Sequence, residues 1–301
     1  MEKAVYHLVD VFTNRAFGGN QLAVFPDARD IPSELMQKIA RELNLSETSF
    51  VLPPEGADSD FRLRIFTPAI ELPMAGHPTV GTAFVLSRLG LIDPSGGARS
   101  VRFQEGVGII RVGLEFPEGA PAIITMEQPL PIFSDPPLDR RRVASLLSID
   151  EAGLDPGLPV EVVSCGVAFL YVPIKNLKTV RALKLRADLW EETLRDSEAP
   201  HVFAFTREVE RHGSTVHSRM FAPAMGIAED PATGAASGPL GCYLVKHGIA
   251  AAGESIISEQ GMEMGRPSFI RIEISLEADK GFSGVRVGGE CVYMGEGFLN
   301  L

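Results

Sequence analysis

The sequence predicts an α+β fold with two pseudo-symmetric domains, each a mostly antiparallel or mixed, barrel-like sheet wrapped around one central helix. Two observations predict it: a segment that occurs twice, and two helices without charge on any face. The two copies of the segment are ELPMAGHPTVGTAFVLSRLG at 71–90 and EDPATGAASGPLGCYLVKHG at 229–248. Their glutamates, prolines and glycines coincide in an ungapped alignment, which indicates two similar structural units.

Flanking segments support the repeat because they occur in the same order around each copy. RIFTPA at 64–69 corresponds to RMFAPA at 219–224, and QEG at 104–106 corresponds to EQG at 259–261. A chain of 301 residues accommodates two domains of about 150 residues. We expect residues 1–118 to form the N-terminal half, completed by a C-terminal strand at about 286–301, and residues 119–285 to form the C-terminal half.

Strands rich in β-branched and aromatic residues dominate the predicted elements. They are expected at Val5–Phe12, Leu22–Phe25, Ser49–Leu52, Phe61–Phe66, Val101–Phe103, Ile109–Leu114, Ile123–Glu127, Val160–Ser164, Phe169–Pro173, Val202–Thr206, Thr215–Phe221, Ile256–Ser258 and Phe269–Ile274. Helices are expected at about 33–43, with Ser33 as the N-cap, and at about 79–89, 139–148, 187–196 and 238–247. The second and the last have no charge before Arg88 and Lys246, which is typical of helices buried on every side.

Composition excludes several classes of function. A net charge of −11 without a basic patch argues against a nucleic-acid partner, and the basic run Arg140–Arg142 is typical of a solvated helix face. No apolar run approaches the roughly 20 residues of a membrane span. Three cysteines and an N-terminus without a signal-peptide pattern indicate the cytoplasm. No cysteine pattern indicates a metal, and the spacing of His212 and His217 is poor for one.

Each copy of the repeat contains a glycine loop that leads into a buried helix. Pro78 suits the first helical turn, and Ser237 is a candidate N-cap. Free backbone N–H groups and the positive end of the helix dipole attract a carboxylate or a phosphate. Two such loops predict a cleft for a small anion between the halves. The alternative is that the glycines only allow a tight turn, and the repetition favours the binding role.

The catalytic group is expected to be a side chain, since no nucleotide-binding motif is present. Ala75 aligns with Thr233, so neither loop presents the thiol of a two-cysteine racemase. The remaining candidates near the loops are the carboxylates and the histidine Glu47, Glu71, His77, Glu229 and Asp230. A local hydrogen bond at a helix start for the histidine, and a capping or surface position for the first glutamate, are the structural alternatives.

Several segments resemble the successive motifs of the PhzF-like phenazine-biosynthesis family. They are VDVFTNRAFGGNQLAVF, LNLSETSFV, RIFTPAIELPMAGHPTVGTAFVL, EDPATGAASGPLGCYLVKHG and EQGMEMGRPS. The resemblance covers about residues 5–299. It implies the fold of diaminopimelate epimerase and proline racemase, an active site between two domains, a cofactor-free isomerase and a homodimer.

The resemblance also implies roles for individual residues. The glutamate of S-E-T is Glu47, the acid/base; His77 and Asp230 would position it or the substrate. The expected substrate-binding residues are Asn20, Ala75, Gly76, Thr233, Gly234 and Ala235, with the backbone of the two glycines and of the last alanine on the substrate carboxylate. The resemblance implies a serine after Thr-Gly, where this chain has Ala235.

The hypothesis is one-base catalysis, in which Glu47 removes a proton next to a carboxylate or a conjugated π-system and returns it to another carbon. An amino-acid epimerase with Asp230 or a water as second base is one alternative. A binding protein that has lost turnover is another, and a role through dimerisation alone is a third. The sequence leaves the substrate open.

Overall fold

The chain forms two compact units, and the computed structural model describes residues 3–93 and 98–301. The first unit comprises Met1–Glu127 and Gly288–Leu301, and the second comprises Gln128–Val287. The boundary falls in β8 (Ile123–Gln128), later than the expected position after residue 118. The reason is that β8 pairs with β7 (Gly108–Glu115) of the first unit.

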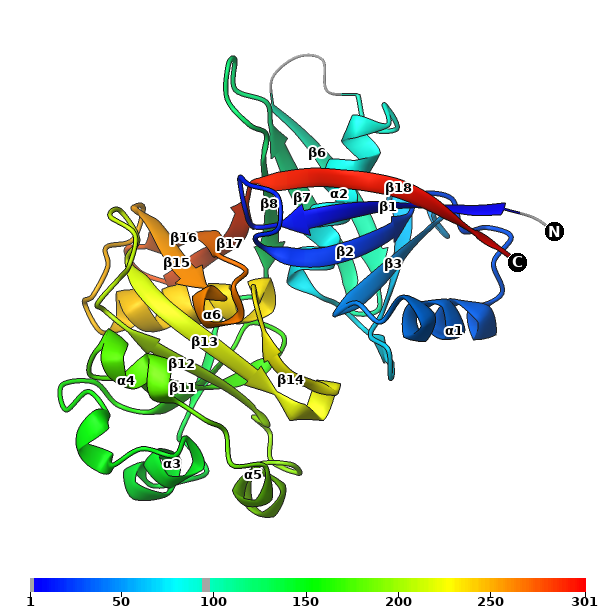
Figure 1. Cartoon of the computed structure of the whole chain (residues 1–301). Helices are drawn as coiled ribbons and strands as arrows, with labels where there is room; N and C mark the ends of the chain where they lie inside the picture. Colours follow the sequence, from blue (N-terminus) through cyan, green and yellow to red (C-terminus); the bar gives the residue numbers. More distant parts are fainter. Residues whose placement is uncertain (1–2, 94–97) are drawn as a thin grey trace. The chain divides into compact units, whose positions relative to one another are not determined.

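One mixed sheet forms the framework of the first unit (Figure 1). Besides β7 and β8, this unit contains β1 (Lys3–Val11), β2 (Asn20–Phe25), α1 (Ser33–Leu43), β3 (Glu47–Leu52), β4 (Phe61–Phe66), β5 (Glu71–Leu72), α2 (Gly76–Arg88), β6 (Ala98–Glu105) and β18 (Cys291–Asn300). The pairing runs β18–β1–β2–β3–β4–β6–β7–β8, with β2–β3 and β4–β6 parallel and the other pairs antiparallel. The last strand of the chain therefore returns to the first strand.

The second unit has the same kind of sheet. Its elements are β9 (Ile132–Ser134), α3 (Arg140–Leu146), β10 (Glu161–Ser164), β11 (Ala168–Pro173), α4 (Leu177–Ala182), α5 (Ala187–Thr193), β12 (His201–Thr206), β13 (Val216–Ala222), β14 (Ile227–Asp230), α6 (Gly234–Lys246), β15 (Ser255–Gln260), β16 (Ser268–Glu277) and the start of β17 (Gly281–Gly289). The pairing runs β9–β10–β11–β12–β13–β15–β16, and β11–β12 and β13–β15 are the parallel pairs.

A buried helix lies at the centre of each unit. Helix α2 packs against β1, β2, β3, β7 and β18, and α6 packs against β10, β11 and β16. Nearly every residue of both helices is buried, as the absence of charge predicts. Glycine permits the close approach: a Cβ at Gly81 would lie 2.6 Å from Val11, and one at Gly241 would lie 2.4 Å from Ile272.

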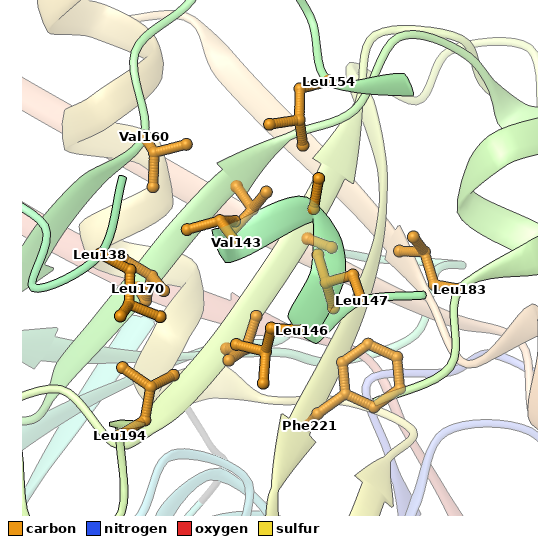
Figure 2. Close-up of a cluster of buried hydrophobic side chains, with 14 of the residues drawn as sticks. Leu138, Val143, Leu146, Leu147, Leu154, Val160, Leu170, Leu183, Leu194 and Phe221 are labelled. Atoms are coloured by element: carbon orange, nitrogen blue, oxygen red, sulfur yellow. The ribbon is translucent and has the colours of Figure 1, made fainter. Parts of the chain in front are cut away.

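Other helices cover the outer faces of the sheets. In the second unit, α3 places Val143, Leu146 and Leu147 against the strand residues Leu170 and Phe221 (Figure 2). In the first unit, α1 buries one apolar face against aromatic residues of β2, β3 and β4. Because these outer helices are amphipathic and the central ones are not, the sequence distinguishes the two layers.

Every predicted strand is present, with ends shifted by a few residues, and α1 has its predicted bounds. Four predictions about helix starts are wrong. Helices α2 and α6 begin at Gly76 and Gly234, earlier than expected, because packing inside the sheet stabilises a first turn that glycine alone disfavours. Ser33 is the first helical residue after the N-cap Pro32, and Ser237 lies inside α6. The sequence analysis also missed α4, β5, β9, β14 and β17.

Each unit contains its own arginine–glutamate ion pair, and the two pairs lie at aligned positions. Arg64 makes two hydrogen bonds of 2.7 Å to Glu71 in the first unit. Arg219 makes two, of 2.8 and 2.7 Å, to Glu229 in the second. Both arginines also lie 5.0 Å from the ring of a phenylalanine two residues later. Each pair ties the strand before the glycine loop to the loop itself.

A buried ionic network links β13 to β15 in the second unit. The His217 side chain contacts Glu259 through Nδ1 and Glu263 through Nε2, both at 2.9 Å. Burial lowers the pKa of His217, but hydrogen bonds to these two carboxylates raise it more, to about 9. At neutral pH the ring is therefore an imidazolium between two carboxylates.

We predict that Gly241→Ala destabilises the protein. The Cβ would overlap Ile272, and overpacking costs about 1–3 kcal/mol, whereas the gain in helix propensity is at most about 1 kcal/mol. Chemical denaturation measures the difference. Gly284→Ala is the matched control, because its Cβ would make an ordinary contact of 3.4 Å with Ser275. Unchanged stability of Gly241→Ala would contradict the close approach of α6 to the sheet.

We predict a pH-dependent loss of stability in His217→Gln. The pKa of His217 is higher in the folded protein than in the unfolded chain, so protonation of this side chain stabilises the fold. The contribution is complete below about pH 6.5 and disappears as the pH rises through about 9. The difference from the unchanged protein should therefore be largest below about pH 6.5 and smallest above pH 9. Unfolding measured across this range tests it, with the exposed His212 changed to glutamine as the control. A constant difference would show that His217 is not charged in the fold.

Candidate functional site

Three predicted site residues of the first unit lie in direct contact. Asn20 and Glu47 are the first residues of the neighbouring parallel strands β2 and β3, and His77 is the second residue of α2. The amide Nδ2 of Asn20 lies 3.2 Å from Nδ1 of His77, and Nε2 of His77 lies 3.2 Å from Oε2 of Glu47. All three side chains are buried, so the glycine loop and two strand ends assemble one compact polar group.

The imidazole in this group is neutral. Burial lowers the pKa of His77 to about 3, although a backbone hydrogen bond with Gln21 opposes the change. When Nδ1 accepts a hydrogen bond from Asn20, the single ring proton is on Nε2 and points toward Glu47. The contact between His77 and Glu47 is within range but not aligned as a good hydrogen bond. Such contacts often tighten when a substrate binds.

The start of α2 has no side-chain cap. Ala75 occupies the N-cap position with extended backbone angles, and the first turn contains no acidic residue. The N–H groups of the first turn have no acceptor within the helix. Gly76 and His77 therefore present the positive end of a helix of 13 residues, an arrangement that binds carboxylates.

In the second unit, Asp230 and Thr233 are joined by hydrogen bonds. The hydroxyl of Thr233 donates to Oδ2 of Asp230 at 2.5 Å and accepts from Nε2 of Gln260 at 2.9 Å. The backbone N–H of Thr233 donates to Oε1 of Gln260 at 3.2 Å, and Nε2 of Gln260 also reaches the carbonyl of Asp230. Gln260 thus holds this loop, a role that the sequence analysis missed.

Helix α6 begins like α2, without a side-chain cap and without an acid in its first turn. Gly234 is buried and Ala235 is partly exposed. The hydroxyl of Ser237 donates to the carbonyl of Thr233 at 2.9 Å, so it is not directed at a ligand. The backbone of the first turn offers the same kind of anion site as α2.

Two of the candidate carboxylates have structural partners. Glu71 and Glu229 each form the two-pronged contact with an arginine described above. Such a contact holds the loop in place. It accounts for these two carboxylates without an acid/base role. Glu47 and Asp230 remain as the carboxylates next to the loops.

The residue equivalent to Glu47 in the second unit is a histidine. Thr48 of β3 lies opposite the phenylalanine of RIFTPA, and Val202 of β12 lies opposite the phenylalanine of RMFAPA. The residues one position earlier, Glu47 and His201, are therefore equivalent, and each begins its strand. The sequence analysis missed this match, because the segments around the two residues have little in common.

His201 is buried, with 6% of its surface exposed. Its Nδ1 has no hydrogen-bond partner among residues 3–93 and 98–301, and burial lowers its pKa to about 4. The ring lies 5.5 Å from that of Phe169, on the strand that pairs with β12. The second unit therefore has a neutral imidazole where the first has a carboxyl group.

Among residues 3–93 and 98–301, groups of metal-binding or reactive type also lie outside the site described above. Glu210, His217 and Glu263 are close enough together to hold a cation. Both ring nitrogens of His217 contact carboxylates, Glu259 and Glu263, so a cation there would have to displace one of them from the ring. Burial raises the pKa of Cys291 to about 12, which disfavours the reactive thiolate.

In the part of the chain that the structure describes, no helix has both the length and the hydropathy needed to cross a membrane.

Sequence comparison matches the chain to the model of a family described as PhzC-PhzF, phenazine biosynthesis-like protein, over residues 9–297. Trans-2,3-dihydro-3-hydroxyanthranilate isomerase of Pseudomonas chlororaphis is 35% identical, with 98% of this chain and 99% of the relative covered. An uncharacterized isomerase of Mesorhizobium japonicum is 36% identical, with 99% of each chain covered.

Comparison of structures gives the same result. A PhzF-family phenazine biosynthesis protein of Bacillus anthracis matches with a TM-score of 0.91 at 28% identity, and all of both chains is covered. A probable proline racemase of Agrobacterium radiobacter matches with a TM-score of 0.67 at 12% identity, over 99% of this chain and 93% of the other, and shows the shared fold alone. The resemblance read from the motifs is confirmed: the chain belongs to the PhzC-PhzF family of phenazine biosynthesis-like proteins.

Proposed function

We propose that this protein is an isomerase of a small metabolite that carries a carboxylate, with Glu47 as the single general acid and base. The observation that supports it best is the buried contact between Glu47, His77 and Asn20 at the uncapped start of α2. The relatives named as isomerases agree with this reaction class.

In the proposed reaction, the carboxylate of Glu47 removes a proton from a carbon next to a carboxylate or a conjugated π-system. The electron pair delocalises, the double bond moves, and the protonated Glu47 returns the proton to another carbon on the same face. Proton and electrons balance within the substrate, so the step needs no cofactor. The N–H of neutral His77 directed at Glu47 would orient the carboxylate for both transfers.

The helix starts would bind and stabilise the negative charge. The substrate carboxylate would accept hydrogen bonds from the first-turn backbone of α2, and the uncapped start of α6 at Gly234 and Ala235 offers a second anion site. Stabilisation of developing charge by fixed donors is worth several kcal/mol in enzymes. Asp230, held by Thr233, is proposed as a positioning residue of the second loop.

The hydroxyl that the resemblance places after Thr-Gly is absent, since this residue is Ala235. We therefore infer that the substrate shares the carboxylate of trans-2,3-dihydro-3-hydroxyanthranilate and differs in the part that a serine would contact.

We also propose a common origin of the two units by duplication, a homodimer and a cytoplasmic location. The first of these is supported by the matched contacts, and the other two by the resemblance and the composition.

Two further candidates are kept. A reaction of the racemase type with a second base is favoured by one observation: the position equivalent to Glu47 holds the ionisable side chain His201. Asp230 or a water is the base that the sequence suggested for this role. A binding protein without turnover would keep the uncapped helix starts and would not require Glu47.

We predict that Glu47→Gln removes proton transfer and leaves ligand binding intact. The amide has the same shape but no basic oxygen, so activity should fall about 10²–10⁴-fold. The measurement is deuterium incorporation from D₂O into turned-over trans-2,3-dihydro-3-hydroxyanthranilate and a panel of small cyclic and amino carboxylic acids, with binding followed by calorimetry. Glu34→Gln on the exposed face of α1 is the control. Exchange at the unchanged rate in Glu47→Gln would refute the assignment.

We predict that turnover moves a double bond and does not invert a single carbon. Nuclear magnetic resonance of the product in D₂O should show deuterium at a new carbon, at less than full incorporation, because one base carries the same proton to both positions. Inversion at one carbon with full deuterium incorporation would favour two bases. In that case the variants His201→Asn and Asp230→Asn identify the second base: the residue whose replacement abolishes exchange in only one direction of the reaction is that base.

A further inference from the structure

Glu105 is a buried carboxyl group beside the first turn of α2 that the proposed reaction does not use. It is the last residue of β6, in the motif QEG, and only 7% of its surface is exposed. Its Oε1 lies 2.7 Å from the hydroxyl of Thr79. Thr79 belongs to α2 and follows His77 by two residues, so this contact joins β6 to the helix turn that carries the site.

The hydroxyl of Thr79 has two short contacts but only one proton. Its Oγ1 lies 2.7 Å from the carbonyl of Ala75 as well as 2.7 Å from Oε1 of Glu105. A carbonyl only accepts, so the proton of Thr79 goes to Ala75. The equivalent bond from Ser237 to the carbonyl of Thr233 shows the same use of the hydroxyl. The contact with Glu105 then needs a proton from the carboxyl group, since two oxygens without a proton between them repel at this distance.

The equivalent residue in the second unit is an uncharged isostere of a carboxylic acid. Strand β6 pairs with β4 as β15 pairs with β13, and QEG matches EQG, so Glu105 corresponds to Gln260. Gln260 is also the last residue of its strand, and its amide holds the loop before α6 through Thr233. Both units thus place a side chain of this shape against the loop before the central helix.

The arginines that line a pocket together with Glu105 are paired with other carboxylates. Its other oxygen, Oε2, is buried and has no hydrogen-bond partner within the described residues. A pocket of about 440 Å³ is lined by Glu105 and by charged residues of β4, β5 and the loop before β4, but these form ion pairs with one another: Arg64 with Glu71 and Arg62 with Glu55. On α2 the titratable neighbour His77 is neutral, and β7 places a glycine opposite.

We propose that Glu105 is held as a neutral carboxylic acid, and that its proton fixes Thr79 and the first turn of α2 so that His77 stays directed at Glu47. Glu105 is therefore a positioning residue, and this role rests on the proposed function of Glu47 and His77. Burial raises the pKa of Glu105 to about 8. The acid is the form present at neutral pH.

The proton on Glu105 makes the stability of the protein depend on pH. Between about pH 4.5 and pH 8 the folded protein holds a proton on Glu105 that the unfolded chain has lost. Stability therefore falls as the pH rises through this range, the opposite of the usual behaviour of a carboxylate. Above about pH 8 the proton of Glu105 leaves. The single hydroxyl proton of Thr79 can then serve either Glu105 or the carbonyl of Ala75, so the first turn of α2 loses one of these two contacts.

The test uses Glu105→Gln, Glu105→Ala and Thr79→Val in the full chain. Glu105→Gln keeps a neutral donor, so its Tm should match that of the unchanged protein at pH 5 and exceed it increasingly toward pH 9. Its activity at pH 7 should stay within about threefold, and the loss of kcat/KM above pH 8 should disappear. Glu105→Ala should lower kcat at every pH. Infrared difference spectra at pH 6 should show the carbonyl stretch of a protonated carboxyl group that Glu105→Gln removes and Thr79→Val shifts.

Three results would overturn the proposal. They are the absence of the protonated carboxyl band at pH 6, a Tm difference for Glu105→Gln that does not change with pH, and a loss of activity in Glu105→Gln as large as that in Glu105→Ala. The first two do not depend on the reaction. If the band and the Tm behaviour are found but Glu47→Gln retains exchange, the neutral acid stands and the assignment of Glu47 fails. If Glu105→Gln does not fold, the infrared test uses Thr79→Val alone. A shift of the carbonyl band in Thr79→Val supports the proposal, and an unchanged band contradicts it.

Discussion

The burial of one whole helix inside each sheet is the constraint on which the rest of this structure depends. A helix surrounded by strands can carry no charge along its length, and α2 and α6 carry none before their last turn. Their first N–H groups cannot be satisfied within the helix, and no side chain caps them. The polar groups that the core excludes are therefore concentrated at the helix starts. At the start of α2 these groups are His77, which contacts Glu47, and Thr79, which contacts Glu105.

The framework of the two units is the same, and their chemistry is different. The arginine–glutamate pairs, the hydroxyl bond back to the N-cap carbonyl and the parallel strand registers occur in both units. At the equivalent loop positions the first unit has Glu47 and His77, and the second has His201 and Ala235. The two units therefore share their supporting contacts and differ in the ionisable side chains at these positions.

Burial decides the protonation state of the groups around α2. Burial lowers the pKa of His77 to about 3 and raises that of Glu105 to about 8, so it favours the uncharged form of both side chains. His217 is equally removed from water but lies between two carboxylates, and it is charged. His217 makes two carboxylate hydrogen bonds, whereas the contact of His77 with Glu47 is not aligned as a hydrogen bond.

The sequence by itself determined the two-unit organisation, most of the strands, the two central helices and the family, because repetition, the absence of charge and the family motifs are visible in the order of residues. Through motifs that resemble one family it also indicated Asn20, Glu47 and His77 as site residues, and these three side chains are in contact in the structure. The tertiary structure alone decided where the helices start, that Glu71 and Glu229 are paired with arginines, and that His201 matches Glu47. It also placed Glu105 against Thr79. These facts depend on strand register and on which atoms share a proton. Both join residues that are far apart in the chain, so they can be known only once the sheet has brought these residues together.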